Sequence, residues 1–207
     1  MEPTEPQSSS LKIDIAGKTV EFKSGRPNLV LEIGHGGAAT IMYPQTEEYL
    51  KTKNTNYLGV DIAPSAHTLA QISAKGKSWA AVESAEVSSL EGQLNNKTDE
   101  VWLRNFSITT NTYEDFAEKW KGIAKIAHEA LKPGGQVVFM DNYSNYDSKT
   151  HGDFKRWFAE QGFNVEDINL STETHPLIAA NRKADLSVEK SGKYNQQAFG
   201  FRAIKLE

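Results

Sequence analysis

The sequence of 207 residues contains no cysteine, which excludes disulfide bonds, thiolate metal ligands and a cysteine nucleophile. It also lacks an uninterrupted run of about 18 apolar residues, so we expect no membrane-spanning helix. The formal net charge is −4, which provides no overall basic surface for gripping nucleic-acid phosphates. Together these absences favour a cytoplasmic protein with no metal and no membrane partner.

The chain length indicates one domain. A domain of this size buries about 70% of its unfolded surface, so it can form a full core without disulfide bonds or bound metal. The first ten residues contain prolines, glutamates and serines but no basic start and no apolar segment. This composition predicts a disordered N-terminus at residues 1–10 rather than a signal peptide. We expect residues 11–207 to form a single domain.

Residues 29–37 read Leu-Val-Leu-Glu-Ile-Gly-His-Gly-Gly. The apolar start predicts a buried strand of a parallel sheet. Three glycines then follow within four residues, and glycine allows a ligand to approach the backbone closely. A strand, a glycine loop and a helix start predict a nucleotide-binding site at the carboxyl end of the strand.

The acidic residue in this stretch, Glu32, lies two residues before Gly34. A carboxylate there would repel a pyrophosphate but could hold an ammonium group, directly or through water. Residues 32–36, Glu-x-Gly-x-Gly, resemble the first motif of the class I S-adenosylmethionine-dependent methyltransferases. Taken alone, the stretch leaves open a glycine turn after a core strand with no ligand.

A second motif lies at residues 131–141, Leu-Lys-Pro-Gly-Gly followed by Gln and an apolar strand. Pro133 is expected to end a helix, and the two glycines to turn the chain. This turn closely resembles the one before the fifth strand of class I methyltransferases. Two motifs far apart in the chain, each on the expected element, make the resemblance much more specific than either motif alone.

The alternation of strands and helices predicts an α/β, Rossmann-like, doubly wound sheet of seven strands. We expect it to be mostly parallel with an antiparallel last strand, and to be preceded by an N-terminal β-hairpin at 11–22. The expected strands begin or lie at 29–33, 57–62, 79–83, 100–103, 137–140, 162–165 and 198–206. The expected helices lie within 38–53, where Pro44 starts, kinks or ends the helix, and at 65–75, 113–131 and 154–161.

The resemblance implies S-adenosylmethionine as methyl donor, with S-adenosylhomocysteine as its product. Asp61 is expected at the end of the second strand, where its carboxylate can accept two hydrogen bonds from ribose hydroxyls. In the family, the loop after the third strand contacts adenine and the end of the fourth strand faces the methyl group. The implied cofactor-binding residues are Glu32, Gly34, His35, Gly36, Asp61, Ile62, Ala85, Glu86 and Asn105.

Methyl transfer from a sulfonium depends mainly on alignment, because the donor is already activated. A general base is needed only where the acceptor must lose a proton. The catalytic candidates are therefore polar residues at strand ends and on covering loops. They are Asn105, Asp141 and His151, with Arg104, Asn142 and His175 in comparable positions.

We expect the acceptor to be an oxygen or nitrogen nucleophile of a small molecule, held under a lid made by residues 142–152 and 171–196. No Asn-Pro-Pro-Tyr motif follows the fourth strand, which disfavours exocyclic amines and glutamine amides as acceptors. The acidic composition disfavours RNA.

Three alternatives remain open. The first is a ribosomal or transfer RNA base methyltransferase, whose basic patch would draw on Lys121, Lys125 and Arg182-Lys183. The second is a non-catalytic protein that binds an adenosyl ligand. The third, an NAD-dependent reductase, is disfavoured because the Tyr49-x-x-x-Lys53 pair precedes the second strand, which is the wrong place for such a catalytic pair.

Overall fold

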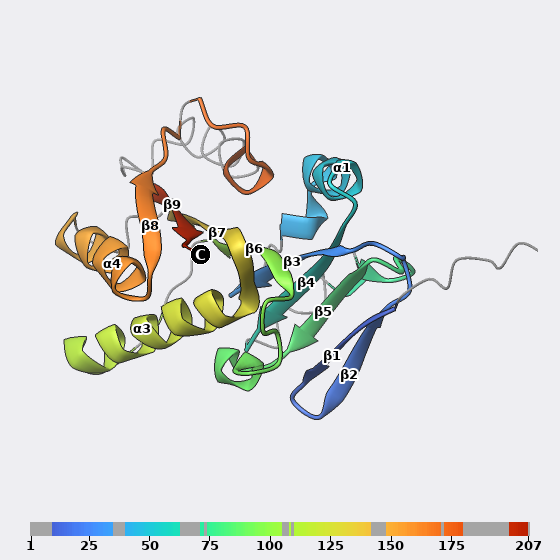
Figure 1. The fold of residues 1–207 in the computed structure, drawn as a ribbon, viewed down its shortest axis with the longest axis horizontal. Helices are drawn as coiled ribbons and strands as arrows, with labels where there is room; N and C mark the ends of the chain where they lie inside the picture. Colours follow the sequence, from blue (N-terminus) through green and yellow to red (C-terminus); the bar gives the residue numbers. More distant parts are fainter. Residues whose placement is uncertain are drawn as a thin grey trace, which may run out of the picture.

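The computed structural model describes residues 10–34, 40–62, 71–72, 74–104, 108, 110–141, 148–170, 172–179 and 199–206. A central sheet of seven strands in the order β5-β4-β3-β6-β7-β9-β8 is covered by other elements on both faces (Figure 1). Its strands are β3 (Asn28–Ile33), β4 (Thr55–Asp61), β5 (Ala80–Ser84), β6 (Thr98–Arg104), β7 (Leu131–Asp141), β8 (Phe163–Asp167) and β9 (Phe199–Lys205).

Strands β3 to β7 pair in parallel, and β9 pairs antiparallel with both β7 and β8. The predicted seven-stranded sheet with an antiparallel last strand is therefore confirmed. Phe139 of β7 lies opposite Phe201 of β9, and the two rings stack with centroids 5.0 Å apart. Such cross-strand aromatic pairs stabilise the register of neighbouring strands.

The predicted N-terminal hairpin is also present, as β1 (Leu11–Ile15) and β2 (Lys18–Phe22). Its alternating residues Ile13, Ile15, Val20 and Phe22 are buried and belong to the main core cluster. The hairpin lies beside the edge strand β5, where Lys18 forms an ion pair with Glu83. It therefore covers part of one sheet face.

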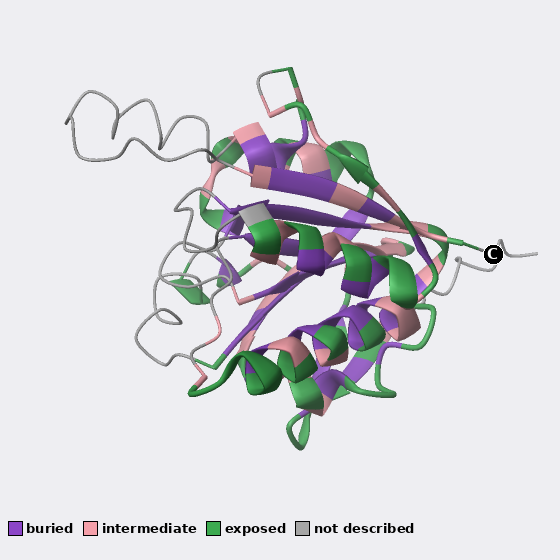
Figure 2. Ribbon diagram, turned by 90° about the vertical axis from the view of Figure 1, so that its left-hand side faces the viewer, coloured by how far each residue is buried: buried purple, intermediate pink, exposed green. Residues whose placement is uncertain are grey.

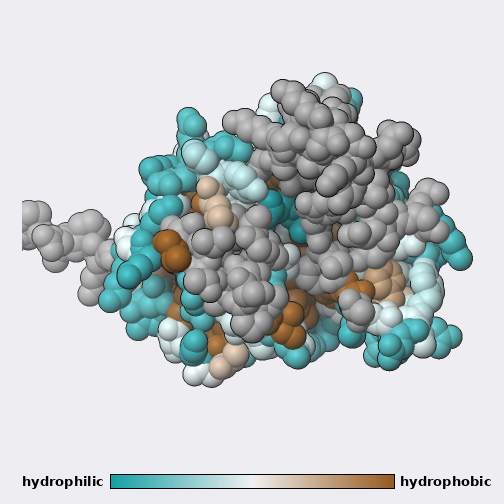
Figure 3. Space-filling model, turned by 180° about the vertical axis from the view of Figure 1, so that it is seen from behind, coloured by the Kyte–Doolittle hydropathy of each residue, from teal (hydrophilic) through white to brown (hydrophobic). Residues whose placement is uncertain are grey.

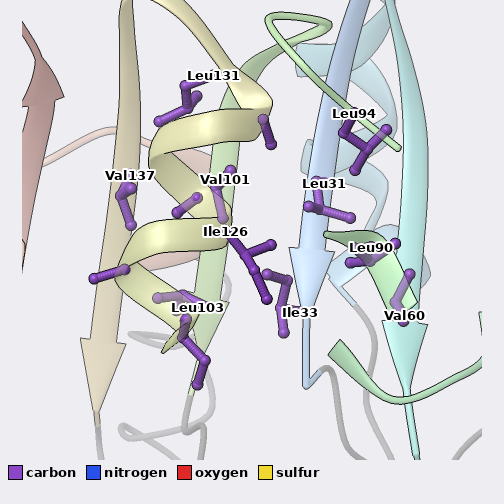
Figure 4. Close-up of a cluster of buried hydrophobic side chains, with 14 of the residues drawn as sticks. Leu31, Ile33, Val60, Leu90, Leu94, Val101, Leu103, Ile126, Leu131 and Val137 are labelled. Carbon is purple, nitrogen blue, oxygen red and sulfur yellow. The ribbon is translucent and has the colours of Figure 1, made fainter. Parts of the chain in front are cut away.

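Helices α3 (Tyr113–Ala130) and α4 (Ser148–Glu160) pack on the same face as the hairpin, together with the 3-10 turn η2 (Val87–Leu90). Thr112 caps α3, because its hydroxyl accepts a hydrogen bond of 3.1 Å from the Asp115 amide. The apolar side of α3 lies over this face of the sheet, where its Ile126 points toward Ile33 of β3 (Figure 4). Figure 2 shows buried residues on the strands and on the inner sides of the helices.

The opposite face is covered by α1 (Pro44–Thr52), by the 3-10 turn η1 (Thr40–Met42) and by residues 172–179. Pro44 begins α1, at the position where a missing amide hydrogen costs nothing. Trp102 and Tyr57 form the middle of the core on this face, with Leu177 and Ile178 over them.

Two boundaries differ from the predicted ones by more than two residues. Helix α4 begins at Ser148 rather than at Phe154, because its first turn is polar and carries no apolar signal. Strand β7 includes the predicted turn at 131–135, since Leu131 pairs with Thr98 before the register shifts. The predicted helix at 65–75 lies mostly outside the described residues, of which 71, 72 and 74 are helical.

Hydrophilic residues dominate the described part of the surface seen from behind, interrupted by smaller apolar areas (Figure 3). Within the described residues, none of the helices combines the length and the apolar character needed to cross a membrane.

Two glycines in different surroundings test the packing of β7. A Cβ added at Gly135 would lie 2.9 Å from the Lys132 carbonyl oxygen and 3.0 Å from that of Asp99. Gly135→Ala should therefore lower the free energy of unfolding by about 1–3 kcal/mol. Gly122, inside α3, has open space where a Cβ would lie. Gly122→Ala should therefore raise the free energy of unfolding by about 0.5–1 kcal/mol. Urea unfolding of both variants measures this, and effects of the same sign would contradict the described packing.

Candidate functional site

The carboxyl ends of β5, β4, β3, β6 and β7 lie in a row along one edge of the sheet. The chain builds outward from β3 through β4 to β5, then returns to the other side of β3 to form β6. This reversal is the topological switch point, where open α/β sheets bind ligands. The residues that follow Ile33, Val60 and Leu103, which share one register level, therefore form the candidate site.

Gly34 directly follows β3 and adopts φ +67°, a left-handed conformation that favours glycine. Its amide donates a hydrogen bond of 2.8 Å to the Val60 carbonyl, next to Asp61. The predicted loop residues His35 and Gly36 lie outside the described residues.

The predicted ribose-binding residue, Asp61, ends β4 and is buried, and Ile62 beside it is 63% exposed. The Asp61 carbonyl accepts a hydrogen bond of 3.1 Å from the Ala85 amide. The end of β4 and the loop after β5, with buried Ala85 and exposed Glu86, are therefore neighbours, and the predicted ligand contacts of Asp61, Ala85 and Glu86 stay predictions.

The Glu32 side chain is fully buried. Its carboxylate accepts hydrogen bonds from the Thr40 amide (2.9 Å), from the Thr40 hydroxyl (2.5 Å) and from the Tyr57 hydroxyl. Burial, followed by the Glu32 charge, raises the pKa of Tyr57, so this phenol stays a donor. Because Thr40 lies on the far side of residues 34–39, Glu32 holds the two ends of the glycine loop together. Its predicted contact with a ligand ammonium group stays a prediction.

Arg104 ends β6 at the switch point and is 6% exposed. Its Nε lies 3.9 Å from Glu32 Oε1, and its Nη1 donates a long hydrogen bond of 3.4 Å to the Tyr43 hydroxyl. The guanidinium carbon lies 5.6 Å from the centre of the Tyr43 ring. The next residue, Asn105, lies outside the described residues.

Two further catalytic candidates, Asp141 and His151, lie close together one strand further along, and Asn142 lies outside the described residues. Asp141 ends β7 and is 1% exposed, and His151 Nε2 lies 3.8 Å from its Oδ2. The His151 ring stacks on Phe199 with centroids 3.9 Å apart and planes 3° from parallel. Phe199 was not predicted as a site residue, although its place at the start of β9, opposite Asp141, brings it there.

A separate cavity of about 260 Å³ lies near the amino ends of the strands and is lined by Asn28, Lys53, Glu100 and Gln136 among others. Sheets of this topology bind their ligands at the opposite edge. We therefore place the candidate site at the row of carboxyl ends.

No family model and no curated protein matches the sequence. Solved methyltransferases match its fold. A mutant 16S rRNA (adenine(1408)-N(1))-methyltransferase from Catenulisporales acidiphilia, solved with S-adenosylmethionine, is 15% identical with a TM-score of 0.56, covering 95% of this chain and 97% of its own. A methyltransferase from Pyrococcus furiosus is 15% identical with a TM-score of 0.57, covering 88% and 77%.

A third match is phosphoethanolamine N-methyltransferase 2 from Haemonchus contortus, solved with phosphomonomethylethanolamine and S-adenosylhomocysteine. It is 15% identical with a TM-score of 0.50, covering 87% of this chain and 49% of its own. The chain has the fold of the class I methyltransferases. At this identity the likeness concerns the fold, so the acceptor class does not follow from it.

The prediction that His175 lies on a loop covering the site is wrong. His175 is buried on the sheet face, where its ring packs edge-on against Trp102 and Tyr49. Its Nε2 lies 2.9 Å from Oε2 of Glu100, four residues before Arg104 on β6. The neighbouring Leu177 and Ile178 insert into the core of that face, which fixes the segment there. Most of the predicted lid, namely residues 142–147, 171 and 180–196, lies outside the described residues.

The Glu100 carboxylate has four hydrogen-bond partners. They are Tyr49 (2.6 Å), Trp102 (2.7 Å), Gln136 (3.1 Å) and His175. Burial alone raises the pKa of the Glu100 carboxyl. Hydrogen bonds and the charge of His175 outweigh burial and lower the pKa to about 2, from an ordinary value of 4.5.

A depressed folded-state pKa stabilises the fold above the unfolded value, and the gain is lost as the pH falls through the folded value. Glu100→Gln should therefore lower the free energy of unfolding by about 3 kcal/mol near neutral pH. The difference from wild type should shrink as the pH falls from about 4.5 toward 2. Denaturant unfolding across this range measures it. The control Glu166→Gln, on a half-exposed carboxylate paired with Arg202 at 3.6 Å, should change stability by less than about 1 kcal/mol. A difference that does not vary with pH would contradict the account of Glu100.

Proposed function

We propose that the chain is a methyltransferase that binds S-adenosylmethionine along the row of carboxyl ends and methylates an oxygen or nitrogen of a small molecule. One observation carries the proposal. Gly34, with its positive φ, lies at the switch point between two buried charged residues, Asp61 on one side and Arg104 on the other. The same fold holds this donor in the Catenulisporales enzyme and its product in the Haemonchus enzyme.

The proposal assigns each part of the donor to residues along the row. Asp61 would accept hydrogen bonds from the ribose hydroxyls, and exposed Ile62 would lie against the adenine. Ala85 and Glu86 would meet the adenine edge. The glycine loop, including His35 and Gly36, would face the methionine part, with Asn105 beyond it. Glu32 supports this arrangement by holding the loop ends through Thr40.

When bound, the donor supplies an activated methyl group, which is transferred in line as the carbon–sulfur bond breaks and its electron pair stays on sulfur. The protein contributes alignment, which is worth up to about 7–11 kcal/mol in favourable cases. An acceptor that carries a proton also needs a base. Asp141 and His151 are proposed for that role, because they lie together one strand beyond Arg104.

A small acceptor agrees with the charge distribution. The net charge is −4, and Lys125, a candidate for an RNA-binding patch, is already paired with Glu91 and Glu129. Those pairs raise the pKa of Lys125 but compensate its charge. The other patch candidates in the variable segment, Arg182 and Lys183, lie outside the described residues.

An RNA base is the second candidate acceptor. Of the three matches described above, the 16S rRNA methyltransferase covers the largest share of both chains. As its name states, that enzyme methylates a ring nitrogen, N1, of adenine.

Binding of the product tests the donor site. S-adenosylhomocysteine should bind the wild-type protein in titration calorimetry, and Asp61→Ala should weaken binding by about 1.5–3 kcal/mol, the scale of a hydrogen bond to a charged group. Asp167→Ala is the matched control, because this carboxylate lies on β8 and its side chain is 68% exposed. Unchanged affinity in Asp61→Ala, or a preference for NAD, would refute the assignment.

Binding to ribosomal subunits and bulk tRNA at several salt concentrations separates the two acceptors. A small-molecule enzyme should show no micromolar binding at physiological salt. Tight binding that falls steeply with salt, and that is lost on charge reversal to Glu at Lys121, Lys125, Arg182 and Lys183, would favour RNA instead.

A further inference from the structure

Arg104 has unfilled hydrogen-bonding capacity in a buried place. A guanidinium carries five N–H donors. Within the described residues, the Arg104 guanidinium makes one hydrogen bond, the 3.4 Å contact with Tyr43, and its buried Nε has no hydrogen-bond partner. A buried donor without an acceptor is costly, so this site is suited to an anionic group that would complete it.

Glu32 does not fill this need. Its Oε1 lies 3.9 Å from Arg104 Nε, which is too far for a hydrogen bond. The same carboxylate already accepts two hydrogen bonds from Thr40 and one from Tyr57. Glu32 therefore compensates part of the positive charge of Arg104 but leaves its donors free for another acceptor.

The position of Arg104 indicates which anion this is. Ile33 pairs with Val60 on one side and with Leu103 on the other, so Asp61 and Arg104 flank Gly34 from opposite strands. Two strand spacings separate them, which is about 10 Å. A donor whose ribose lies at Asp61 and whose chain crosses Gly34 brings its amino-acid end to Arg104.

We propose that Arg104 binds the carboxylate of the donor's amino-acid part. This inference rests on the proposed function. The guanidinium fork matches a carboxylate in two parallel hydrogen bonds, which are stronger than bonds between neutral groups. The Tyr43 ring lies beside the guanidinium, and its hydroxyl accepts a hydrogen bond from Nη1. Glu32 Oε1 lies 3.9 Å from Arg104 Nε, so the predicted contact of Glu32 with the ligand ammonium group would fall at the same end of the donor.

Two ligands that differ in the amino-acid part test the assignment. S-adenosylhomocysteine contains this part, whereas 5′-methylthioadenosine keeps the adenosine and the thioether without it. Calorimetry should show that Arg104→Met weakens binding of the first by about 10- to 100-fold and changes binding of the second by less than about two-fold. Arg104→Lys keeps the charge without the fork and should show a smaller loss, again only for the first ligand.

Arg26→Met is the matched control. Arg26 precedes β3 at the amino end of the sheet, donates to the Thr55 carbonyl at 2.8 Å and lies over the Trp79 ring. This variant should leave both affinities unchanged. Thermal unfolding confirms that each variant is folded, and if Arg104→Met does not fold, Arg104→Lys alone carries the comparison.

The remaining outcomes overturn the inference. Equal weakening of both ligands would mean that Arg104 serves only to hold the glycine loop through Glu32. Unchanged affinity for S-adenosylhomocysteine would mean that the anion belongs to the acceptor or that none binds. If the wild-type protein binds neither ligand, the proposed function fails together with the inference. If the wild-type protein binds both ligands and the Arg104 variants weaken both affinities equally, only the proposed role of Arg104 fails.

Discussion

The candidate site depends on the buried carboxylate of Glu32. A charge in the interior needs close partners, and removing one partner of such a group costs about 3–5 kcal/mol. Thr40 and Tyr57 provide hydrogen bonds, and Arg104 provides the nearest positive charge. These partners come from η1, β4 and β6, so one carboxylate on β3 joins three elements and closes the loop that begins at Gly34.

A second buried carboxylate has a different task. Glu100 lies lower on β6 and binds donors from α1, β7 and the segment after β8. Its bond to His175 fixes residues 172–179 on the sheet face beside Trp102. Glu32 therefore joins the elements around the candidate site, whereas Glu100 anchors residues 172–179 on the sheet face.

The sequence predicted the features that local patterns determine. Alternation gave the hairpin at 11–22, apolar runs gave the parallel strands, and three- and four-residue spacing gave α3. Features that depend on distant contacts were missed or misplaced. The partner of His175 lies 75 residues away in sequence, so no local pattern distinguishes it from a loop histidine. The bonds of Glu32 to Thr40 and Tyr57 were missed for the same reason, because they form only when the chain brings β3, β4 and η1 together. Its predicted contact with a ligand ammonium group stays a prediction. Arg104 had no distinctive signal beyond its place at a strand end.

We propose that an adenosyl donor lies across the switch point between β3 and β6, and a crystal structure grown with S-adenosylhomocysteine tests this most directly. We expect ligand density across Gly34, with the ribose hydroxyls at Asp61 and the amino-acid carboxylate at Arg104. Density in the cavity lined by Asn28 and Lys53 at the amino ends of the strands, or an empty switch point at saturating ligand, would contradict it.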